Sequence, residues 1–345
     1  MIDPKQLTCA VIGAGRMGVR HVQAAKQLGM QVVGIMDVVA ETAKAACKSE
    51  GLPESAAFND AREMLARTRP QAVVVATTAP SHCDLVIAAA DAGTRYILCE
   101  KPLASSLEEA DRMLAACERA GAQLAVNHQM RFMPNYFRVK ALIGTERIGP
   151  LVAVQVAGSN FGLAMNGSHY FEMFRYMTGR DIHAVQAWFD DVRLTNPRGP
   201  QFDDRAGQVR ATTADGSSLF MDFSAGAGHG LQCTYICRYA QITVDELAGE
   251  IRITARKDEY RELPTTRYGM PADIERIAIE PVEVVAPTIS LWKAMLSGET
   301  FPQGRDAGLH ALRCLVAAHA SHARQGSAVA LADTALSPSQ HFDWA

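Results

Sequence analysis

The sequence lacks the long apolar runs and strongly charged stretches that mark two large classes of protein. No stretch approaches the length of about eighteen apolar residues that a membrane-spanning helix needs. The formal net charge is only −3, and there is no basic run or basic patch interleaved with aromatic residues. We therefore expect no membrane partner and no nucleic-acid partner. The first residues carry an acid and a proline where a signal peptide has basic and then apolar residues, so we predict a cytoplasmic protein.

Metal-binding and disulfide motifs are also lacking. The eight cysteines form no CxxC pair, and their spacing matches no zinc motif. Several lie in apolar runs, where a reduced cysteine behaves as a small apolar residue. Three histidines near the C-terminus, His310, His319 and His322, have no acid spaced to join them. We predict buried reduced thiols and no metal site, and we interpret the three histidines as surface or subunit-contact residues.

A glycine-rich loop lies between two apolar runs near the N-terminus. The run Leu7–Ile12 is typical of a strand buried on both faces, and Val19–Leu28 is typical of a helix. A second apolar run ends at Asp37, nineteen residues after the last loop glycine. The loop between the first run and the helix has the pattern G-x-G-x-x-G, formed by Gly13, Gly15 and Gly18. This strand–loop–helix–strand–acid order predicts a dinucleotide-binding fingerprint.

Each position of the fingerprint has a physical role. Gly13 permits the tight turn, Gly15 lets the backbone approach a pyrophosphate, and Gly18 lets the helix pack close to the strand. Asp37 can accept hydrogen bonds from both ribose hydroxyls of NAD, and it would repel the 2′-phosphate of NADP. Arg16 is a cation that would offset this repulsion, but no cation stands beside Asp37, so we predict NAD over NADP. The predicted cofactor-binding residues of this region are Gly13, Ala14, Gly15, Arg16, Met17, Gly18 and Asp37.

The pattern of strands and helices continues to about residue 126. Further buried strands are predicted within 71–80, 95–102 and 122–127, and helices within 61–68, 82–93 and 107–121. Ser106 with Glu109 three residues on predicts a capping box. We predict an α/β Rossmann domain, a doubly wound parallel sheet, over residues 1–126. Ligands of such sheets bind beyond the carboxyl ends of the strands. Candidate cofactor-binding residues there are Thr77, Pro80, His82, Glu100, Lys101 and Asn127.

Residues 127–345 have a different pattern of apolar runs and turns. Strand-like runs separated by short turns cover 183–192, 206–224, 231–255 and 280–286, and Asp215-Gly216 is a hairpin signal. Helices are predicted over 133–144, 164–178, 288–296 and 306–325, and a further strand over 151–159. We predict a substrate-binding and oligomerisation domain of the α+β class, with a large, mostly antiparallel open sheet.

Four segments carry a resemblance to a known family. They are GAGRMG at 13–18, EKP at 100–102, NHQMRF at 127–132 and AMNGSHYFEMFRYMTG at 164–179. Together they resemble the Gfo/Idh/MocA oxidoreductases, relatives of glucose–fructose oxidoreductase and inositol dehydrogenase. The resemblance implies a homodimer or homotetramer that pairs through the open sheet. It also implies an NAD(P)-dependent oxidoreductase that interconverts a secondary alcohol and a ketone on a sugar, cyclitol or sugar derivative.

The resemblance also implies two catalytic residues. Lys101 matches the lysine that lies between nicotinamide and substrate, where an ammonium can polarise the substrate oxygen. His169 matches a histidine that shuttles the hydroxyl proton, which suits an imidazole because its charge changes near neutral pH. The candidate substrate-binding residues are Lys101, Arg131, Asn160, His169 and Tyr170.

The sequence departs from the family at one position. The family has an aspartate four residues before the histidine, and Met165 stands there in this chain. Asn166 and Glu172 lie nearby and are candidates to substitute in part. Two other functions stay open. One is a redox-neutral enzyme that retains NAD and carries out elimination, epimerisation or glycoside cleavage. The other is a non-catalytic dinucleotide sensor.

Overall fold

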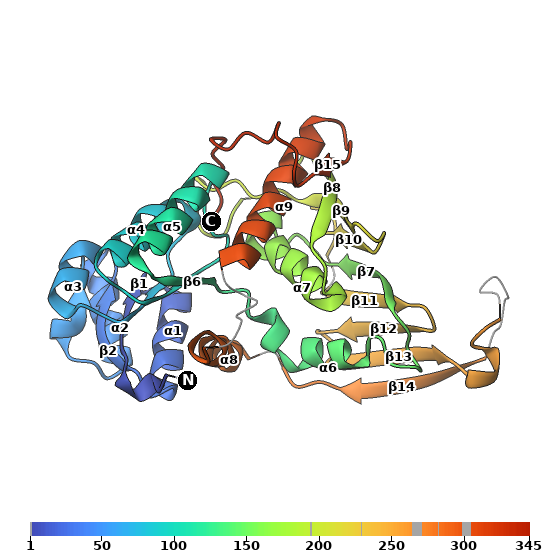
Figure 1. Ribbon diagram of the computed structural model, residues 1–345, viewed down its shortest axis with the longest axis horizontal. Helices are drawn as coiled ribbons and strands as arrows, with labels where there is room; N and C mark the ends of the chain where they lie inside the picture. The colour runs from blue at the N-terminus through green and yellow to red at the C-terminus, as the bar shows by residue number, and fades with distance from the viewer. Residues whose placement is uncertain (1, 194, 229, 264–270, 282, 299–304) are drawn as a thin grey trace.

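The computed structural model describes residues 2–193, 195–228, 230–263, 271–281, 283–298 and 305–345. The described residues form two β-sheets with helices packed against them (Figure 1). The first sheet has six parallel strands in the order β3-β2-β1-β4-β5-β6. Its strands are β1 (Thr8–Ile12), β2 (Gln31–Met36), β3 (Ala57–Phe58), β4 (Ala72–Val75), β5 (Tyr96–Cys99) and β6 (Gln123–Val126).

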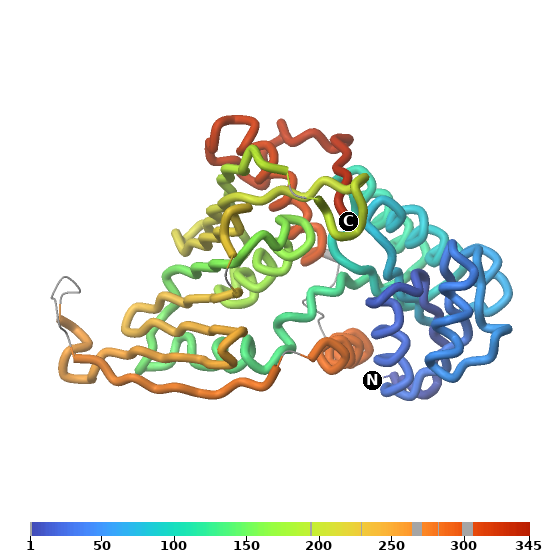
Figure 2. Tube along the Cα trace, turned by 180° about the vertical axis from the view of Figure 1, so that it is seen from behind, coloured from blue at the N-terminus to red at the C-terminus, as the bar shows by residue number. Residues whose placement is uncertain are grey.

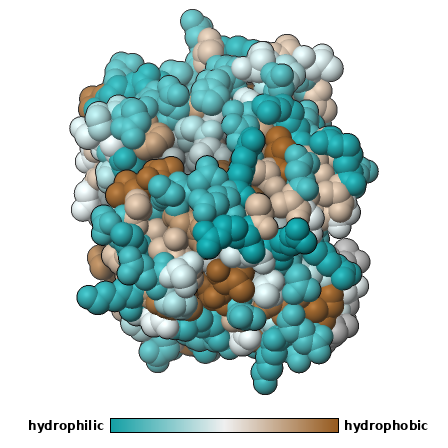
Figure 3. Space-filling model, turned by 90° about the vertical axis from the view of Figure 1, so that its left-hand side faces the viewer, coloured by the Kyte–Doolittle hydropathy of each residue, from teal (hydrophilic) through white to brown (hydrophobic). Residues whose placement is uncertain are grey.

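Five helices cover the two faces of this sheet. They are α1 (Arg16–Gln27), α2 (Ala40–Ser49), α3 (Ala61–Thr68), α4 (His82–Asp91) and α5 (Leu107–Ala120). Because both faces are covered, the central strands β1, β4 and β5 are almost entirely buried. The outer end of this half of the molecule is mainly hydrophilic, with small hydrophobic groups scattered among polar side chains (Figure 3). The predicted Rossmann fold is confirmed.

Local signals at the ends of α5 behave as the sequence predicts. The Ser106 hydroxyl accepts a hydrogen bond from the Glu109 amide at 3.1 Å, and the Glu109 carboxylate accepts one from the Ser105 amide at 2.9 Å. These bonds satisfy amides that the first turn of a helix leaves without an intrahelical partner. Gly121 adopts a left-handed conformation, with φ of 65°, and ends the helix. The cap holds α5 directly after the segment that carries Glu100 and Lys101.

The second sheet has nine strands in the order β14-β13-β12-β11-β7-β10-β9-β8-β15. Every neighbouring pair is antiparallel except β7 and β10, which are parallel. The strands are β7 (Leu151–Ala157), β8 (Ile182–Phe189), β9 (Gly207–Thr213), β10 (Ser218–Asp222), β11 (Gln232–Cys237), β12 (Ala240–Asp245), β13 (Glu250–Arg256), β14 (Ala272–Ala278) and β15 (Val329–Ala330). The predicted mostly antiparallel sheet is confirmed.

Helices lie on the face of this sheet that is turned toward the first sheet (Figure 1). They are α6 (Pro134–Leu142), α7 (Ser168–Thr178) and α9 (Arg305–Ala323). The inward side chains of the sheet join one continuous apolar core with α7, α9 and the first sheet. On the opposite face Trp188 and Phe220 are 44% and 40% exposed, and Arg210 lies over the Phe220 ring. No helix of the described residues covers this outer face.

Helix α8 (Val285–Leu296) follows the nine-stranded sheet in sequence but packs on the first half of the molecule. Its buried side chains Leu291 and Trp292 share an apolar cluster with the first sheet and α1. The Ile2 amide donates a hydrogen bond to the Leu296 carbonyl at 3.1 Å. The predicted strand over 280–286 is wrong, because Val285 already begins α8 and the other described residues of that run pair with no strand. Thus part of the chain after residue 127 belongs by packing to the first half.

The C-terminal segment packs back onto the molecule. The Phe342 amide bonds to the Ser105 carbonyl at 2.9 Å, so the chain end lies beside the segment before α5 (Figure 2). Phe342 and Trp344 stack and enclose His319.

The three C-terminal histidines are half-buried, and their interpretation as subunit-contact residues stays a prediction. His310 and His322 accept hydrogen bonds from the backbone amides of Ile182 and Phe189, at 3.0 and 3.1 Å, and so join α9 to β8.

All eight cysteines are buried and unpaired, as predicted. None of the described helices combines the length and the apolar character needed to cross a bilayer.

Candidate active site

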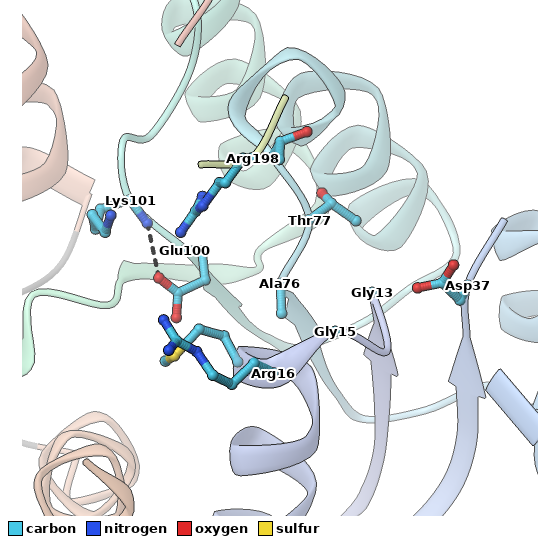
Figure 4. Close-up of a pocket in the computed structure, with 11 residues that line it drawn as sticks. Gly13, Gly15, Arg16, Asp37, Ala76, Thr77, Glu100, Lys101 and Arg198 are labelled. Atoms are coloured by element: carbon cyan, nitrogen blue, oxygen red, sulfur yellow. Dashed lines mark hydrogen bonds between the residues drawn. The ribbon is translucent and has the colours of Figure 1, made fainter. Parts of the chain in front are cut away.

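A cavity of about 440 Å³ opens beyond the carboxyl ends of β1, β2, β4 and β5 (Figure 4). This edge is where ligands of doubly wound sheets bind. The glycine loop and Asp37 lie along one side of the cavity, and Glu100 and Lys101 lie at the other end. Its lining includes Gly15, Arg16, Asp37, Thr77, Lys101 and Arg198.

The glycine loop has the shape that a pyrophosphate requires. Gly13 has φ of +97°, and a side chain at Gly18 would clash with the Gly13 carbonyl. At Gly15 an added Cβ atom would meet nothing within 4 Å. A side chain there would therefore occupy the cavity itself. Helix α1 begins at Arg16, so its unpaired amides and positive dipole end face the same space.

Asp37 fits the ribose end of a dinucleotide. Its carboxylate accepts hydrogen bonds from the Ala14 amide at 2.9 Å and from the Val39 amide at 3.0 Å. These two bonds hold the carboxylate at the rim of the cavity, beside the glycine loop (Figure 4). The neighbouring Val38 is 82% exposed and offers no charge. The described residues therefore fit NAD at both the pyrophosphate and the ribose positions.

Glu100 is the centre of a buried hydrogen-bond network. Its carboxylate lies 2.8 Å from His21 Nε2 and accepts a hydrogen bond from Asn127 Nδ2 at 2.8 Å. Burial alone would raise the pKa of this carboxyl, but the bond and charge of His21, with the charge of Lys101, hold the pKa well below its usual range. Glu100 is therefore ionised, and it ties α1, β5 and the end of β6 together. This network fixes the backbone that carries Lys101.

Lys101 is buried at the end of the cavity, with 8% of its surface exposed. Its ammonium donates a hydrogen bond to the Met165 carbonyl, and its peptide bond to Pro102 is cis. Burial lowers the pKa of Lys101 to about 8, with Glu100 and Asp204 opposing the shift and Arg198 adding to it. Lys101 is thus a cation at neutral pH, and it loses its proton as the pH rises past about 8.

Two histidines meet behind Lys101. The rings of His128 and His169 are edge to face, with centroids 5.5 Å apart. Burial and the charge of Lys101 lower the pKa of His128 to about 3, and the same two causes hold the pKa of His169 well below the usual value. Both rings are therefore neutral near pH 7. Nδ1 of His169 and both ring nitrogens of His128 have no hydrogen-bond partner within the described residues.

His169 lines a cavity of its own, of about 190 Å³, which shares no lining residue with that of Lys101. The groups around it are mostly hydrogen-bonding side chains. They include Gln129, Tyr136, Asn166, Tyr170 and Glu246. The Tyr136 hydroxyl donates to the Glu246 carboxylate at 2.8 Å. The structure thus places Lys101 and His169 in separate cavities, but the charge of Lys101 still acts on the His169 ring.

Other predicted residues lie away from these cavities. His82 is fully buried behind the lysine segment, with Nδ1 2.9 Å from the Pro102 carbonyl and Nε2 3.2 Å from the Thr77 carbonyl. Burial lowers the pKa of His82, so the neutral ring donates to one carbonyl at a time. It supports the segment and does not line the cavity. Pro80 and Asn160 are exposed, and neither lines a cavity described above.

Arg131 and Glu172 bind each other. The Arg131 guanidinium donates to the buried Glu172 carboxylate and lies over the Tyr176 ring, 4.8 Å from its centroid. Glu172 also lies 3.7 Å from Arg175. Glu172 is therefore engaged by arginines and does not replace the missing acid, and the structure does not bring Arg131 to Lys101 or His169. Asn166 lines the His169 cavity, but its amide donates to the Phe161 carbonyl at 2.6 Å.

Sequence reasoning missed Arg198 and Asp204 as site residues. Both come from the irregular segment between β8 and β9, which reaches across to the first half of the molecule. The Arg198 side chain points into the cavity beside Lys101 (Figure 4). No periodicity marks this segment, so only the fold reveals these residues. His128 could have been noticed, because it directly follows Asn127 in a motif that the sequence already singles out.

Comparison with known proteins agrees with this geometry. Residues 7–128 match the GFO_IDH_MocA model, an oxidoreductase family with an NAD-binding Rossmann fold. The match covers the Rossmann half of the chain, which is similar to the Gfo/Idh/MocA oxidoreductases. The predicted resemblance is therefore confirmed, and NAD is the cofactor that the family description gives.

Relatives match over more of the chain. A D-apiose dehydrogenase from Paraburkholderia graminis is 29% identical over 95% of this chain and 90% of its own. An inositol 2-dehydrogenase from Pseudarthrobacter chlorophenolicus is 32% identical over 56% of this chain and 60% of its own.

Solved structures share the fold over both halves. An oxidoreductase from Agrobacterium radiobacter, in complex with NAD+, L-tartaric acid and magnesium, has a TM-score of 0.78 at 20% identity, over 94% of this chain and 98% of its own. An inositol dehydrogenase homologue from Azotobacter vinelandii, complexed with NADH and myo-inositol, has a TM-score of 0.76 at 17% identity, over 94% and 97%.

Proposed function

We propose that this protein is an NAD-dependent dehydrogenase that interconverts a secondary alcohol and a ketone on a sugar, cyclitol or sugar derivative. The observation that carries the proposal is the position of Lys101. This buried lysine lines the same cavity as the glycine loop and Asp37, directly beyond β5. The curated relatives named above, a D-apiose dehydrogenase and an inositol 2-dehydrogenase, support the substrate class.

The chain's own residues would hold the cofactor along the cavity. The open space at Gly15 and the first amides of α1 suit the pyrophosphate, and Asp37 suits the ribose hydroxyls. Thr77, at the end of β4, lines the wall between them and Lys101. When bound, NAD accepts or supplies the hydride.

Lys101 would act on the substrate oxygen. In carbonyl reduction its ammonium donates a hydrogen bond that polarises the carbonyl, and in oxidation it stabilises the alkoxide that forms. A pKa of about 8 keeps the group protonated at neutral pH while making its proton easier to give than that of an ordinary lysine. The Glu100 network supports this role because it fixes the residue before the lysine and binds the amide of the lysine itself.

His169 would carry the proton of the substrate hydroxyl. Its ring is neutral, so it can accept that proton, and Nδ1 has no hydrogen-bond partner within the described residues. The cavity on its side, with Asn166, Tyr170 and Glu246, offers donors and acceptors suited to a substrate with several hydroxyl groups. We no longer include Arg131 and Asn160 among the substrate contacts, because neither lines this cavity.

A substrate panel tests the proposal. Purified protein would be incubated with NAD or NADP and with pentoses, hexoses, inositols and sugar acids, while NADH absorbance is recorded. We expect turnover with at least one polyhydroxylated substrate, faster with NAD. NAD binding without turnover on the whole panel would contradict it. Cofactor retained through purification, with substrate converted but no net NADH, would indicate a redox-neutral enzyme, and binding with no conversion a sensor.

The outer face of the nine-stranded sheet is our proposed subunit interface. Trp188 and Phe220 lie on it among polar side chains, and no described helix covers it. Such a face, partly apolar and otherwise uncovered, suits a homodimer or homotetramer. A cytoplasmic location stays a prediction from the sequence.

A further inference from the structure

Met165 stands where the family resemblance implies an acid, and a carboxylate from elsewhere in the chain binds the backbone at this position. Asp204 belongs to the segment between β8 and β9, far from residue 165 in sequence. Its Oδ1 accepts a hydrogen bond from the Ala164 amide at 2.7 Å, and its Oδ2 accepts one from the Met165 amide at 2.8 Å. The carboxylate therefore binds the turn 163–167 that leads into the His169 helix.

The surrounding backbone is shaped to admit this carboxylate. Gly162 has φ of +71°, and a side chain at Gly162 would clash with the Asp204 carboxylate. The Leu163 amide donates to the Arg205 carbonyl at 3.0 Å, which is a further bond between the same two segments. Glycine at 162 thus serves both the turn and the close approach of Asp204.

Lys101 meets the same turn from the other half of the molecule. Its ammonium donates to the Met165 carbonyl, while the Met165 amide donates to Asp204. The charged and titratable groups that act on Lys101 are Glu100 and Arg198, with Asp204 itself, and the His128 and His169 rings feel the charge of Lys101. Asp204 is the member of this set that brings negative charge from the second half of the molecule.

We propose that Asp204 is a positioning residue of the site, supplied by the segment between β8 and β9 in a chain that carries Met165 and no acid at position 165. It holds the turn 163–167 against Lys101, and it supplies negative charge that keeps the lysine protonated. The proposal rests on the proposed function only in treating Lys101 as the catalytic cation. Because burial raises the pKa of Asp204 while two amides and Lys101 oppose that shift, its charge depends on these same contacts.

The test measures the protonation of Lys101 directly, without a substrate. The full-length protein would be labelled with an amine-reactive acylating reagent at a series of pH values, and modification of Lys101 would be followed by mass spectrometry. Asp204→Asn removes the charge and keeps a similar shape. We expect the pH of half-maximal reactivity to fall, because removing a nearby opposite charge lowers the pKa of an ammonium.

Asp203→Asn is the matched control. Asp203 is adjacent in sequence and loses the same charge, but its carboxylate pairs with Arg193 at the surface. This variant should leave the Lys101 titration unchanged. Asp204→Ser, which can still accept a hydrogen bond from a backbone amide, is the second variant should Asp204→Asn fail to fold, and it should shift the titration in the same direction.

An unchanged Lys101 titration in a folded Asp204 variant would overturn the proposal, even if turnover fell, because the role would then be only structural. The outcome is separate from that of the substrate panel. A panel without turnover would contradict the dehydrogenase assignment, whereas the labelling experiment still decides whether Asp204 governs the charge of Lys101.

Discussion

The two sheets of this molecule differ in how they are buried, and the difference decides what each contributes to the site. The strands of the six-stranded sheet are covered on both faces, as in β4, where all four residues are buried. In the nine-stranded sheet, inward residues alternate with outward ones, as in β12. The first sheet therefore offers a ligand the ends of its strands, and the second offers a free outer face and long connecting segments.

The cofactor and the catalytic groups follow the same division. Under the proposed function, the first half would hold NAD largely through backbone groups of the glycine loop and through Asp37, all within one short stretch of sequence. The second half contributes His169 from a helix and Arg198 and Asp204 from an irregular segment. The proposed cofactor contacts thus lie close together in sequence, whereas the proposed catalytic groups come from distant parts of the chain.

The largest effect on stability is expected where the second part of the chain packs on the first. Trp292 of α8 is fully buried against the first sheet and α1. Trp292→Ala should lower the free energy of unfolding by about 3–5 kcal/mol, because truncating a buried tryptophan leaves a large cavity. Urea unfolding followed by circular dichroism measures this. A loss as small as that of an exposed tryptophan would show that α8 is not part of the first half's core.

A somewhat smaller effect is expected for the ribose contact. Asp37→Ala should weaken NAD binding on the order of tenfold to a hundredfold, since a hydrogen bond to a charged group contributes about 1.5–3 kcal/mol. NADP binding should weaken less, because the variant also removes the repulsion of the 2′-phosphate. Isothermal titration calorimetry with both cofactors decides this. Asp84→Ala, on the exposed side of α4, is the control and should change neither affinity.

The pH dependence of activity distinguishes the lysine of the first half from the histidine of the second. The pKa of Lys101 lies at about 8, below the usual value for lysine. The ammonium is therefore present below pH 8 and is lost above it, so kcat/KM for carbonyl reduction should fall about tenfold per pH unit well above 8. A reduction rate that stays constant up to pH 10 would contradict a protonated lysine as the group that polarises the carbonyl.

The smallest effect on stability is expected on the outer face of the nine-stranded sheet. Trp188 is 44% exposed, and Trp188→Ala should change the free energy of unfolding of a single chain by less than about 1 kcal/mol. The same variant should weaken self-association if this face pairs subunits. Sedimentation velocity over a range of concentrations measures the second effect, and an unchanged assembly would argue for another interface.

The first half was predictable because its signals are local. Apolar runs mark β1, β2, β4, β5 and β6, and the capping box at Ser106 marks the start of α5. Two elements were not predicted. β3 has only two residues, too few to show a period, and α2 buries only the small side chains of Ala43, Ala46 and Cys47, so it has no strong apolar stripe.

The strands of the second half were predictable where apolar and polar residues alternate, and they were not predictable at the edge of the sheet. β14 is the edge strand, and six of its seven residues are exposed, so no apolar side marks it as a strand. Val284 and Val285 gave the opposite error, because helix α8 begins there despite the strand propensity of valine.

The residues of the candidate site also fall into those that local motifs predict and those that only tertiary packing reveals. Local motifs identify Gly13, Gly15, Asp37 and Lys101, and the structure brings these residues around one cavity. Asp204 and Arg198 lie in a segment without periodicity, and only tertiary packing brings them to Lys101. His82 was placed correctly at the end of a strand, but its ring turns toward backbone carbonyls and away from the cavity. Position along a strand predicts where a residue lies, and not which way its side chain points.

The most direct test compares cofactor binding with turnover in Lys101→Met, which keeps an unbranched side chain and removes the ammonium. We predict that NAD affinity stays close to that of the native protein, because the glycine loop and Asp37 are untouched, while kcat/KM on the best substrate of the panel falls by about 10²–10³. A variant that binds NAD and turns over that substrate at the native rate would contradict the assignment of Lys101 as the group that acts on the substrate oxygen.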